Sequence, residues 1–159
     1  MNRTLRFFLV AALLAFTASC DETGDVAAAP PPAEYGGEAI GYFCNILLAE
    51  HAGTTGQVPL ASRPEPLWFS SVRDTVAFTL LEGEPKDVTA IYVNDMAKAT
   101  DWASPEPGSW VSLEDAWLVI ESRRRGGMGL REVVPFGSEA SAQNFKAEHS
   151  GRVVRLDEV

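Results

Sequence analysis

The sequence has few cysteines, few histidines and little positive charge. Its 159 residues include two cysteines and two histidines, and 13 Lys and Arg stand against 22 Asp and Glu, for a formal net charge of −9 at pH 7. Two cysteines are too few for a disulfide-rich scaffold or a four-cysteine zinc site, and two histidines exclude a zinc held by three histidines. The acidic balance argues against nucleic acid as a partner, because phosphate binding needs a basic surface.

The motifs of common enzyme classes are also missing. The chain has no G-x-S-x-G, no Walker loop, no H-E-x-x-H and no G-x-G-x-x-G. A nucleophilic pair of Cys44 and His51 is conceivable, but nothing in the sequence supplies an oxyanion hole or a third member. We therefore expect a protein that is not an enzyme.

Residues 1–19 have the pattern of a lipoprotein signal peptide. Arg3 and Arg6 precede ten uninterrupted apolar residues, and small residues then lead to Cys20. Ten apolar residues are too few to span a bilayer, which takes about 20. The stretch T-A-S-C resembles a bacterial lipobox, with Thr17 in place of the usual leucine, so we expect Cys20 to carry the lipid anchor. Ordinary cleavage, with Cys20 free or in a disulfide, is the alternative.

Residues 20–39 form the predicted spacer between the anchor and the folded body. They include three consecutive prolines, several alanines and acidic residues without apolar periodicity, a composition typical of a flexible, solvated and extended segment. Loss of the signal peptide removes Arg3 and Arg6, which leaves 11 basic and 22 acidic residues and a charge of −11. Such a protein is not expected to lie flat on anionic lipid. Its acidic body instead suggests a partner with basic patches.

The rest of the chain predicts an α+β fold made of two small ββαβ units packed together, at residues 40–104 and 105–159. β-Branched and aromatic runs indicate strands, and the apolar run at 116–120 is expected to be central in its sheet. Helices are expected to begin after Ser71, with Asp74 completing a capping-box variant, and after Ser138. The expected strands are 57–60, 89–93, 116–120, 133–136 and 152–156, and the expected loops are 94–108 and 123–129.

A faint internal repeat supports the two units. Phe69 and Phe78 are nine residues apart, as are Phe136 and Phe145, and each pair brackets the start of an expected helix. An internal duplication is the favoured interpretation, with coincidence as the alternative.

Four side chains are candidate ligands for a soft metal. With Cys20 lipidated, Cys44 is the single remaining thiol, which is unusual outside the cytoplasm, and its thiolate is a donor suited to Cu(I). His51 follows seven residues later, two turns along a helix or within reach of a folded loop. Met128 lies between glycines, where it makes a poor core residue, and Met96 directly follows a strand. The alternatives are a buried apolar cysteine and gap-filling methionines.

Two basic features have structural interpretations. His149 ends the second expected helix, where a cation suits the helix dipole. The run of three arginines at 123–125 suits a solvated hairpin end, which we favour over a clamp for an anion.

Several stretches resemble one family, the nitrous-oxide-reductase accessory lipoproteins called NosL. The motifs are GYFC…AEH, PLWFSSVRD, AIYVNDMAKA…W and RGGMG…E-VVPFGSEA, in this order from about Gly41 to the C-terminus. The resemblance implies a two-unit ββαβ lipoprotein that is anchored on the periplasmic side of a bacterial membrane and carries Cu(I). It also implies delivery of copper to nitrous oxide reductase and its membrane maturation machinery.

One position departs from the family pattern. The family has a Cys-x-Met pair that binds Cu(I), and in this sequence Cys44 matches the cysteine but Ile46 stands at the methionine position. Cys44 and Met128 then remain as ligands, with His51 and Met96 in reserve. The alternative function is an assembly factor that has lost its copper site, and a thiol-dependent enzyme that uses Cys44 is a third hypothesis.

Overall fold

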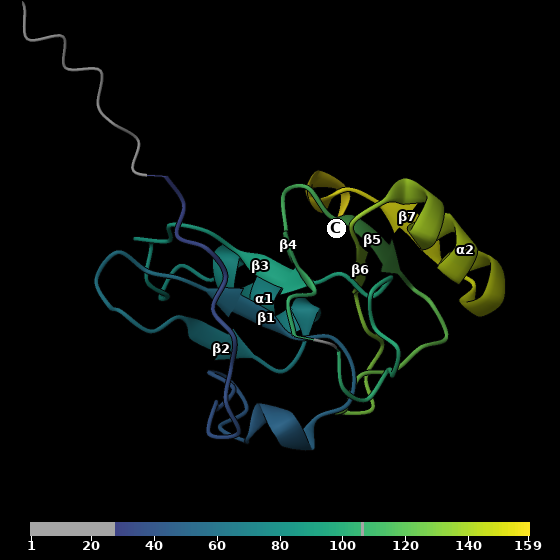
Figure 1. The fold of residues 1–159 in the computed structure, drawn as a ribbon. Helices are drawn as coiled ribbons and strands as arrows, with labels where there is room; N and C mark the ends of the chain where they lie inside the picture. The colour runs from purple at the N-terminus through teal and green to yellow at the C-terminus, as the bar shows by residue number, and fades with distance from the viewer. Residues whose placement is uncertain (1–27, 106) are drawn as a thin grey trace, which may run out of the picture.

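The computed structural model describes residues 28–105 and 107–159, and these fold into two antiparallel sheets (Figure 1). The predicted signal peptide and Cys20 lie outside the described residues. The first sheet has the order β2-β1-β3-β4 and the second the order β6-β5-β7. The bounds of the strands are β1 Gly56–Val58, β2 Leu67–Phe69, β3 Tyr92–Asn94, β4 Trp110–Ser112, β5 Trp117–Ile120, β6 Val134–Phe136 and β7 Arg152–Val154.

One helix packs on each sheet. Helix α1 (Val72–Leu80) contacts β1 and β2, and α2 (Glu139–His149) contacts all three strands of the second sheet. The caps are those predicted from the sequence: Ser71 Oγ accepts the N–H of Asp74, and Ser138 Oγ accepts the N–H of Ser141. Two short 3-10 helices complete the fold, η1 (Leu48–Glu50) and η2 (Leu156–Glu158).

The two units share one topology, which confirms the predicted α+β fold of two ββαβ units. In each unit the first strand is central, the second and third strands flank it, and the helix connects those two. The structure explains the nine-residue spacing of the repeated phenylalanines, because the two rings of each pair join the end of a strand to the helix that follows. The ring centroids of Phe69 and Phe78 are 5.4 Å apart, and those of Phe136 and Phe145 are 5.2 Å apart.

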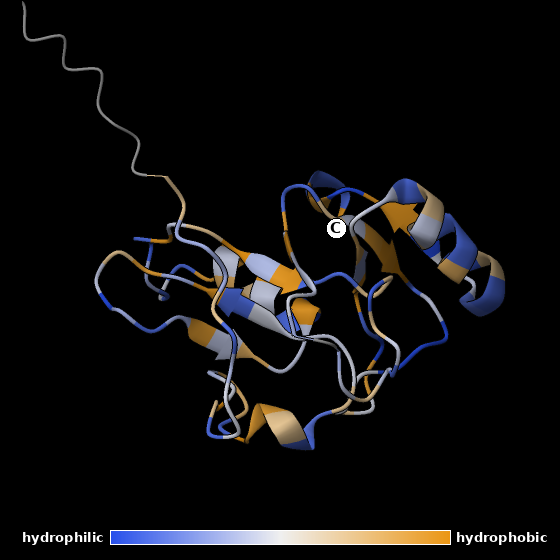
Figure 2. Ribbon diagram, in the orientation of Figure 1, coloured by the Kyte–Doolittle hydropathy of each residue, from blue (hydrophilic) through white to orange (hydrophobic). Residues whose placement is uncertain are grey.

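A shared core fixes the units against each other. Val72 and Val93 of the first unit belong to the same buried cluster as Leu118, Val133 and Val154 of the second. Each unit also has a cluster of its own beneath its helix, around Phe78 in one and around Val134 in the other. Figure 2 shows the hydrophobic residues concentrated on the strands of the second sheet, whereas α2 carries many hydrophilic residues. No helix among residues 28–105 and 107–159 is long and apolar enough to cross a bilayer.

Three elements differ from the sequence prediction. β2 and β4 were not expected. β2 lies in the run that leads into the first helix, and β4 directly follows the turn-rich stretch 94–108. β4 pairs with β3, so the first sheet continues beyond residue 104, where the sequence suggested the boundary between the units. The expected strand at 152–156 ends at Val154, and η2 follows, where the Glu158 side chain accepts the N–H of Arg155.

The second half of the predicted spacer lies on the first sheet rather than free in solvent. The side chain of Gln57 exchanges two hydrogen bonds with the backbone of Ala33, at 2.8 and 2.9 Å, and the Tyr92 hydroxyl donates to the Pro30 carbonyl. The Glu34 carboxylate accepts the indole N–H of Trp110 at 3.1 Å. We call residues 30–39 the docked segment. Its prolines and alanines gave no sign of these partners.

We expect Gln57→Ala to release the docked segment. Gln57 is fully buried, and its loss leaves the backbone N–H and C=O of Ala33 without their partners, at a cost of about 1–3 kcal/mol in the free energy of unfolding. Hydrogen exchange should show faster exchange over residues 30–39. The matched control is Gln143→Ala, on the exposed face of α2. Equal protection of the docked segment in both variants would contradict this account.

Candidate metal centre

A tight turn at residues 40–47 presents Cys44. The N–H of Gly41 donates to the Ile46 carbonyl at 2.9 Å, and the N–H of Asn45 donates to the Gly41 carbonyl at 2.8 Å. The turn closes around the sulfur so tightly that a Cβ at position 41 would lie 2.5 Å from Cys44 Sγ. Only glycine fits there without displacing the thiol. The turn directly follows the docked segment in the chain. Cys44 therefore comes just after residues that are held against the first sheet.

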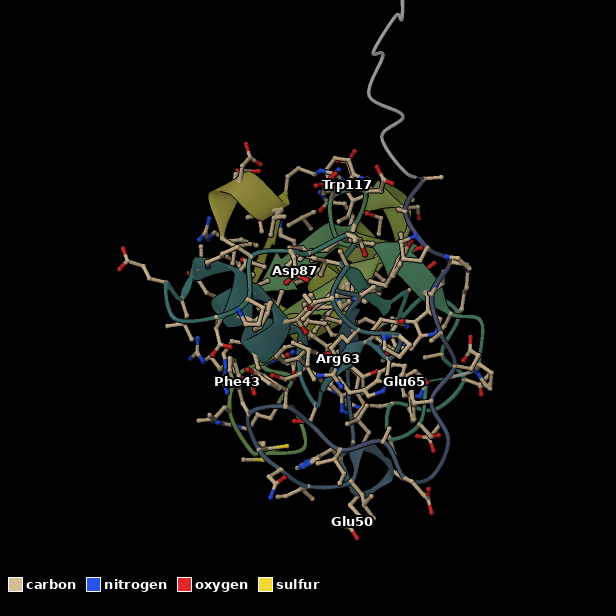
Figure 3. The ribbon with its side chains drawn as sticks, turned by 90° about the vertical axis from the view of Figure 1, so that its left-hand side faces the viewer. Phe43, Glu50, Arg63, Glu65, Asp87 and Trp117 are labelled. Carbon is tan, nitrogen blue, oxygen red and sulfur yellow. The ribbon has the colours of Figure 1, made fainter. Side chains whose placement is uncertain are left out.

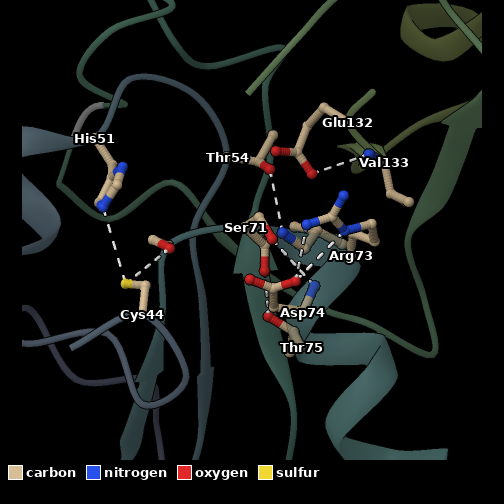
Figure 4. Close-up of polar contacts among 11 residues, drawn as sticks. Cys44, His51, Thr54, Ser71, Arg73, Asp74, Thr75, Glu132 and Val133 are labelled. Atoms are coloured by element: carbon tan, nitrogen blue, oxygen red, sulfur yellow. Dashed lines mark hydrogen bonds and ion pairs between the residues drawn. The ribbon is translucent and has the colours of Figure 1, made fainter. Parts of the chain in front are cut away.

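The structure brings His51 to Cys44. The single turn of η1 lies between them, and His51 Nε2 lies 3.8 Å from Cys44 Sγ (Figure 4). The buried Ser70 hydroxyl forms a hydrogen bond with the same sulfur at 3.3 Å. Both Cys44 and His51 are partly exposed. The thiol therefore forms a hydrogen bond with a buried hydroxyl and also lies close to a partly exposed imidazole.

The loop between β5 and β6, which carries Met128, lies against His51. Arg125 closes the loop by donating from Nη1 to the Gly129 carbonyl at 2.7 Å. A Cβ at Gly127 would lie 3.0 Å from His51 Nδ1 and 2.9 Å from the backbone nitrogen of Ala52. The backbone next to Met128 therefore lies against the imidazole ring that faces Cys44. Met128 itself is 51% exposed, which is unusual for a methionine and leaves its thioether open to solvent.

The other two residues singled out in the sequence lie elsewhere. Met96 is buried in the core of the second unit, packed with Val134 and Phe136, and so fills space there as a core methionine. His149 ends α2 as predicted, and its ring lies 4.4 Å from that of Phe145. The structure therefore unites Cys44, His51 and the Met128 loop, and it does not bring Met96 to them.

Sequence reasoning missed two side chains at this end of the molecule. Ser70 contacts Cys44 only through tertiary structure, because the two residues are 26 positions apart in the chain. Glu132 is buried beneath the Met128 loop, where its carboxylate accepts the N–H of Val133 at 2.9 Å (Figure 4). Burial raises the pKa of Glu132 from its ordinary value of 4.5 to about 7, against the opposing influence of its hydrogen bonds and of the Arg73 charge. A glutamate directly before an apolar strand was the available signal.

The ligand set is limited to soft and borderline donors. Among residues 28–105 and 107–159, no group of three or more His, Cys, Asp or Glu side chains gathers as a metal site. Hard cations prefer several oxygens, whereas thiolate and thioether favour Cu(I) and imidazole suits copper and zinc. The arrangement is therefore suited to a soft metal ion near the surface.

The fold and the site thus define a two-unit α+β protein with a partly exposed thiol, imidazole and methionine loop at one end. The sequence model of the NosL family matches residues 32–159, and the chain belongs to that family. This confirms the resemblance that the motifs indicated.

Named relatives support the assignment. The chain is 40% identical to the copper-binding lipoprotein NosL of Achromobacter cycloclastes over 160 residues, which is all of this chain and 82% of the relative. It is 25% identical to the copper-binding lipoprotein NosL of Stutzerimonas stutzeri, over 95% of this chain and 78% of the relative.

Two solved structures share the fold. The crystal structure of the copper chaperone NosL from Shewanella denitrificans matches with a TM-score of 0.73 and 26% identity, covering 82% of this chain and 97% of that one. The solution structure of apo-NosL from Achromobacter cycloclastes matches with a TM-score of 0.50 and 39% identity, covering 65% of this chain and 83% of that one.

We expect the buried Glu132 to make stability depend on pH. Its pKa is higher in the folded protein, so the folded state binds more protons between about pH 4.5 and 7. The contribution of Glu132 to the free energy of unfolding is then fully present below pH 4.5 and is lost, by roughly 3 kcal/mol, as pH rises through 7. Chemical denaturation of Glu132→Gln should show this dependence removed, whereas the exposed control Glu65→Gln keeps it. Equal pH dependence in both variants would contradict the assignment.

Proposed function

We propose that this protein is a copper chaperone that carries Cu(I) and delivers it to nitrous oxide reductase through the membrane maturation machinery of that enzyme. The observation that carries the proposal is the meeting of Cys44 and His51 beside the Met128 loop. The relatives' names, copper-binding lipoprotein and copper chaperone, support it. They are consistent with a protein that is not an enzyme.

The spacing of the two nearest donors suits a shared metal ion. Bonds of about 2.3 Å to sulfur and about 2.0 Å to nitrogen, as in zinc sites, place the two ligand atoms about 3.7 Å apart when they meet at 120°. The observed separation of Cys44 Sγ and His51 Nε2 is 3.8 Å. The thioether of Met128 is the proposed third donor. Thiolate, thioether and imidazole together form a set that favours Cu(I).

Ile46 is the feature that favours the alternative function. It has no donor atom, and its side chain is 38% exposed two residues after Cys44. Its backbone carbonyl, rather than its side chain, closes the turn onto Gly41. A methionine at this position would therefore leave the turn intact. If the remaining ligands fail to hold copper, the protein acts as an assembly factor that has kept the family fold.

Partial exposure suits a protein that must release its metal. Cys44 and His51 are partly exposed and Met128 is half exposed, so the proposed ligands open to one side of the molecule. A partner's thiol or thioether can then reach the copper ion while it is still held by this chain. Exchange of one ligand at a time avoids free copper.

We further propose that lipidated Cys20 anchors the protein on the periplasmic side of a bacterial membrane. The signal-peptide pattern and the lipobox resemblance support this, as do the relatives, which are named lipoproteins. An acyl anchor holds a protein at a membrane without a spanning helix.

The direct test is an anaerobic Cu(I) titration against a chromophoric chelator. It uses the unlipidated mature chain, residues 20–159 with Cys20→Ser, so that Cys44 is the only thiol. We expect one tightly bound Cu(I), with Cys44→Ser weakening binding more than about 100-fold, beyond the usual effect of changes outside the ligand set. Met128→Ala and His51→Ala should each weaken it less, and Ile46→Met should strengthen it.

The alternatives give different results in the same titration. No binding by the natural sequence, with binding restored by Ile46→Met, would overturn the chaperone proposal and favour the assembly factor. Tight binding that survives Cys44→Ser would place the copper ion elsewhere.

We expect Gly41→Ala to weaken Cu(I) binding by about tenfold or more, because the new Cβ displaces the sulfur from Ser70 and His51. The control is Gly36→Ala, where a Cβ meets no heavy atom within 4 Å. Both variants are measured in the same titration, with circular dichroism as the check on folding. Equal affinities would show that the close approach of Gly41 to the sulfur has no part in metal binding.

A further inference from the structure

The surface around the proposed copper site differs in charge from the rest of the molecule. The mature chain carries 11 basic and 22 acidic residues, yet four of the 11 basic residues lie within the nine residues 123–131, which contain no acidic residue. Arg73, on the first turn of α1, lines the same small hollow as Met128 and Arg131. An acidic protein therefore presents a basic region where its proposed ligands are exposed.

Apart from Arg73, the arginines of this region form no ion pair with a carboxylate in the described part of the chain. Arg125 and Arg131 are paired across the base of the Met128 loop and are both exposed. Arg124 lies over the Trp102 ring at 4.3 Å. Among residues 28–105 and 107–159, Arg73 is the one arginine of this region with a carboxylate within 4 Å, that of Asp74. The nearby Glu132 is buried, which leaves Glu50, on η1, as the exposed carboxylate beside His51.

Apolar side chains lie among the charges. Phe43 and Ile46 flank Cys44 and are 40% and 38% exposed, and Met128 and Leu130 on the loop are each 51% exposed. Figure 3 shows Glu50 at the lower edge of the molecule and Phe43 at its left side, both below Trp117, which is at the top. We call the following residues the site face: Phe43, Ile46, Met128, Leu130, Arg73, Arg124, Arg125 and Arg131. Exposed apolar groups rimmed by charge are typical of protein interaction surfaces.

We propose that the site face docks a partner protein of complementary surface. On that partner, the copper ligands lie beneath an apolar surface that is surrounded by acidic side chains. This inference rests on the proposed function, because the face surrounds the proposed ligands and the partner must reach them. The charge on this face is opposite to that of the whole chain, so the basic partner suggested by composition does not fit here. Attraction between an arginine rim and carboxylates raises the rate of encounter and fixes orientation.

A membrane is the other anionic surface that such a face could meet, and the position of the anchored end argues against it. The described chain begins at residue 28, at the opposite side of the molecule from η1 and the loop that follows β5 (Figure 1). Residues 20–28 can span at most roughly 30 Å. An anchor at Cys20 therefore attaches the molecule through the side opposite the site face.

The test measures copper transfer from the unlipidated mature chain, with Cys20→Ser, to copper-free nitrous oxide reductase together with its purified maturation complex. Arg131→Glu and the double variant Arg125→Glu/Arg131→Glu reverse charges on the face. The controls Lys146→Glu and Lys86→Glu/Lys146→Glu make the same change of net charge outside it. We expect the double face variant to transfer copper about tenfold more slowly than its control at low salt, with the difference vanishing near 0.5 M NaCl.

Affinity for Cu(I) separates docking from metal binding. The affinity for Cu(I) should be unchanged in Arg131→Glu. If Arg125→Glu alters the affinity by loosening the Met128 loop, the transfer test uses Arg131→Glu and its control Lys146→Glu. Face variants that transfer copper as fast as their controls at every salt concentration would overturn the proposal. The proposal would also be overturned, in favour of a lipid surface, if the unlipidated mature chain binds phosphatidylglycerol vesicles and Arg131→Glu abolishes that binding.

The proposed function and the docking proposal can fail separately. If the natural chain binds no Cu(I), direct binding of the metal-free chain to the same acceptors still tests the face. Binding that weakens with salt and with Arg131→Glu, but not with Lys146→Glu, would support the docking surface without the copper role. Equal binding by all variants would overturn the docking surface as well.

Discussion

Two close approaches of the backbone, at Gly41 and Gly127, hold the candidate centre together. At Gly41 the chain folds so tightly that Cys44 Sγ occupies the space of a side chain, and at Gly127 the loop of the second unit lies against His51 and Ala52. The ligands come from both units, so their geometry depends on the shared core that fixes one unit against the other. The site is therefore a product of the whole fold, although each of its residues lies in a loop or turn.

The repeat clarifies which part of the fold is specialised. Both units have the same strand order and the same contact between two phenylalanines, which serve packing. They differ in the connection between their first two strands. In the second unit this connection carries Met128 and the arginines, whereas in the first unit residues 59–66 carry prolines and no sulfur. The repeated framework provides stability, whereas the proposed ligands come from the segment before β1, which carries Cys44 and His51, and from the loop after β5, which carries Met128.

Local sequence signals predicted the framework well. The caps at Ser71 and Ser138 and the central apolar strand β5 are decided by neighbouring residues and by burial, which a single sequence displays. The pairing of Cys44 with His51 was considered because their spacing allowed it. The role of Gln57 in holding the docked segment, the contact of Ser70 with the thiol and the burial of Glu132 depend on residues distant in the sequence. Composition also did not reveal the basic site face. The net charge is a sum over the whole chain, whereas the basic and acidic side chains lie on different parts of the surface.

The central claim is that Cys44, His51 and Met128 bind one copper ion together, and X-ray absorption at the copper edge tests it most directly. The measurement uses the Cu(I)-loaded, unlipidated chain and its Met128→Ala variant. The account predicts two sulfurs and one imidazole nitrogen bound to copper, with one sulfur lost in the variant. Copper bound by nitrogen and oxygen alone, or a sulfur count unchanged by Met128→Ala, would contradict it.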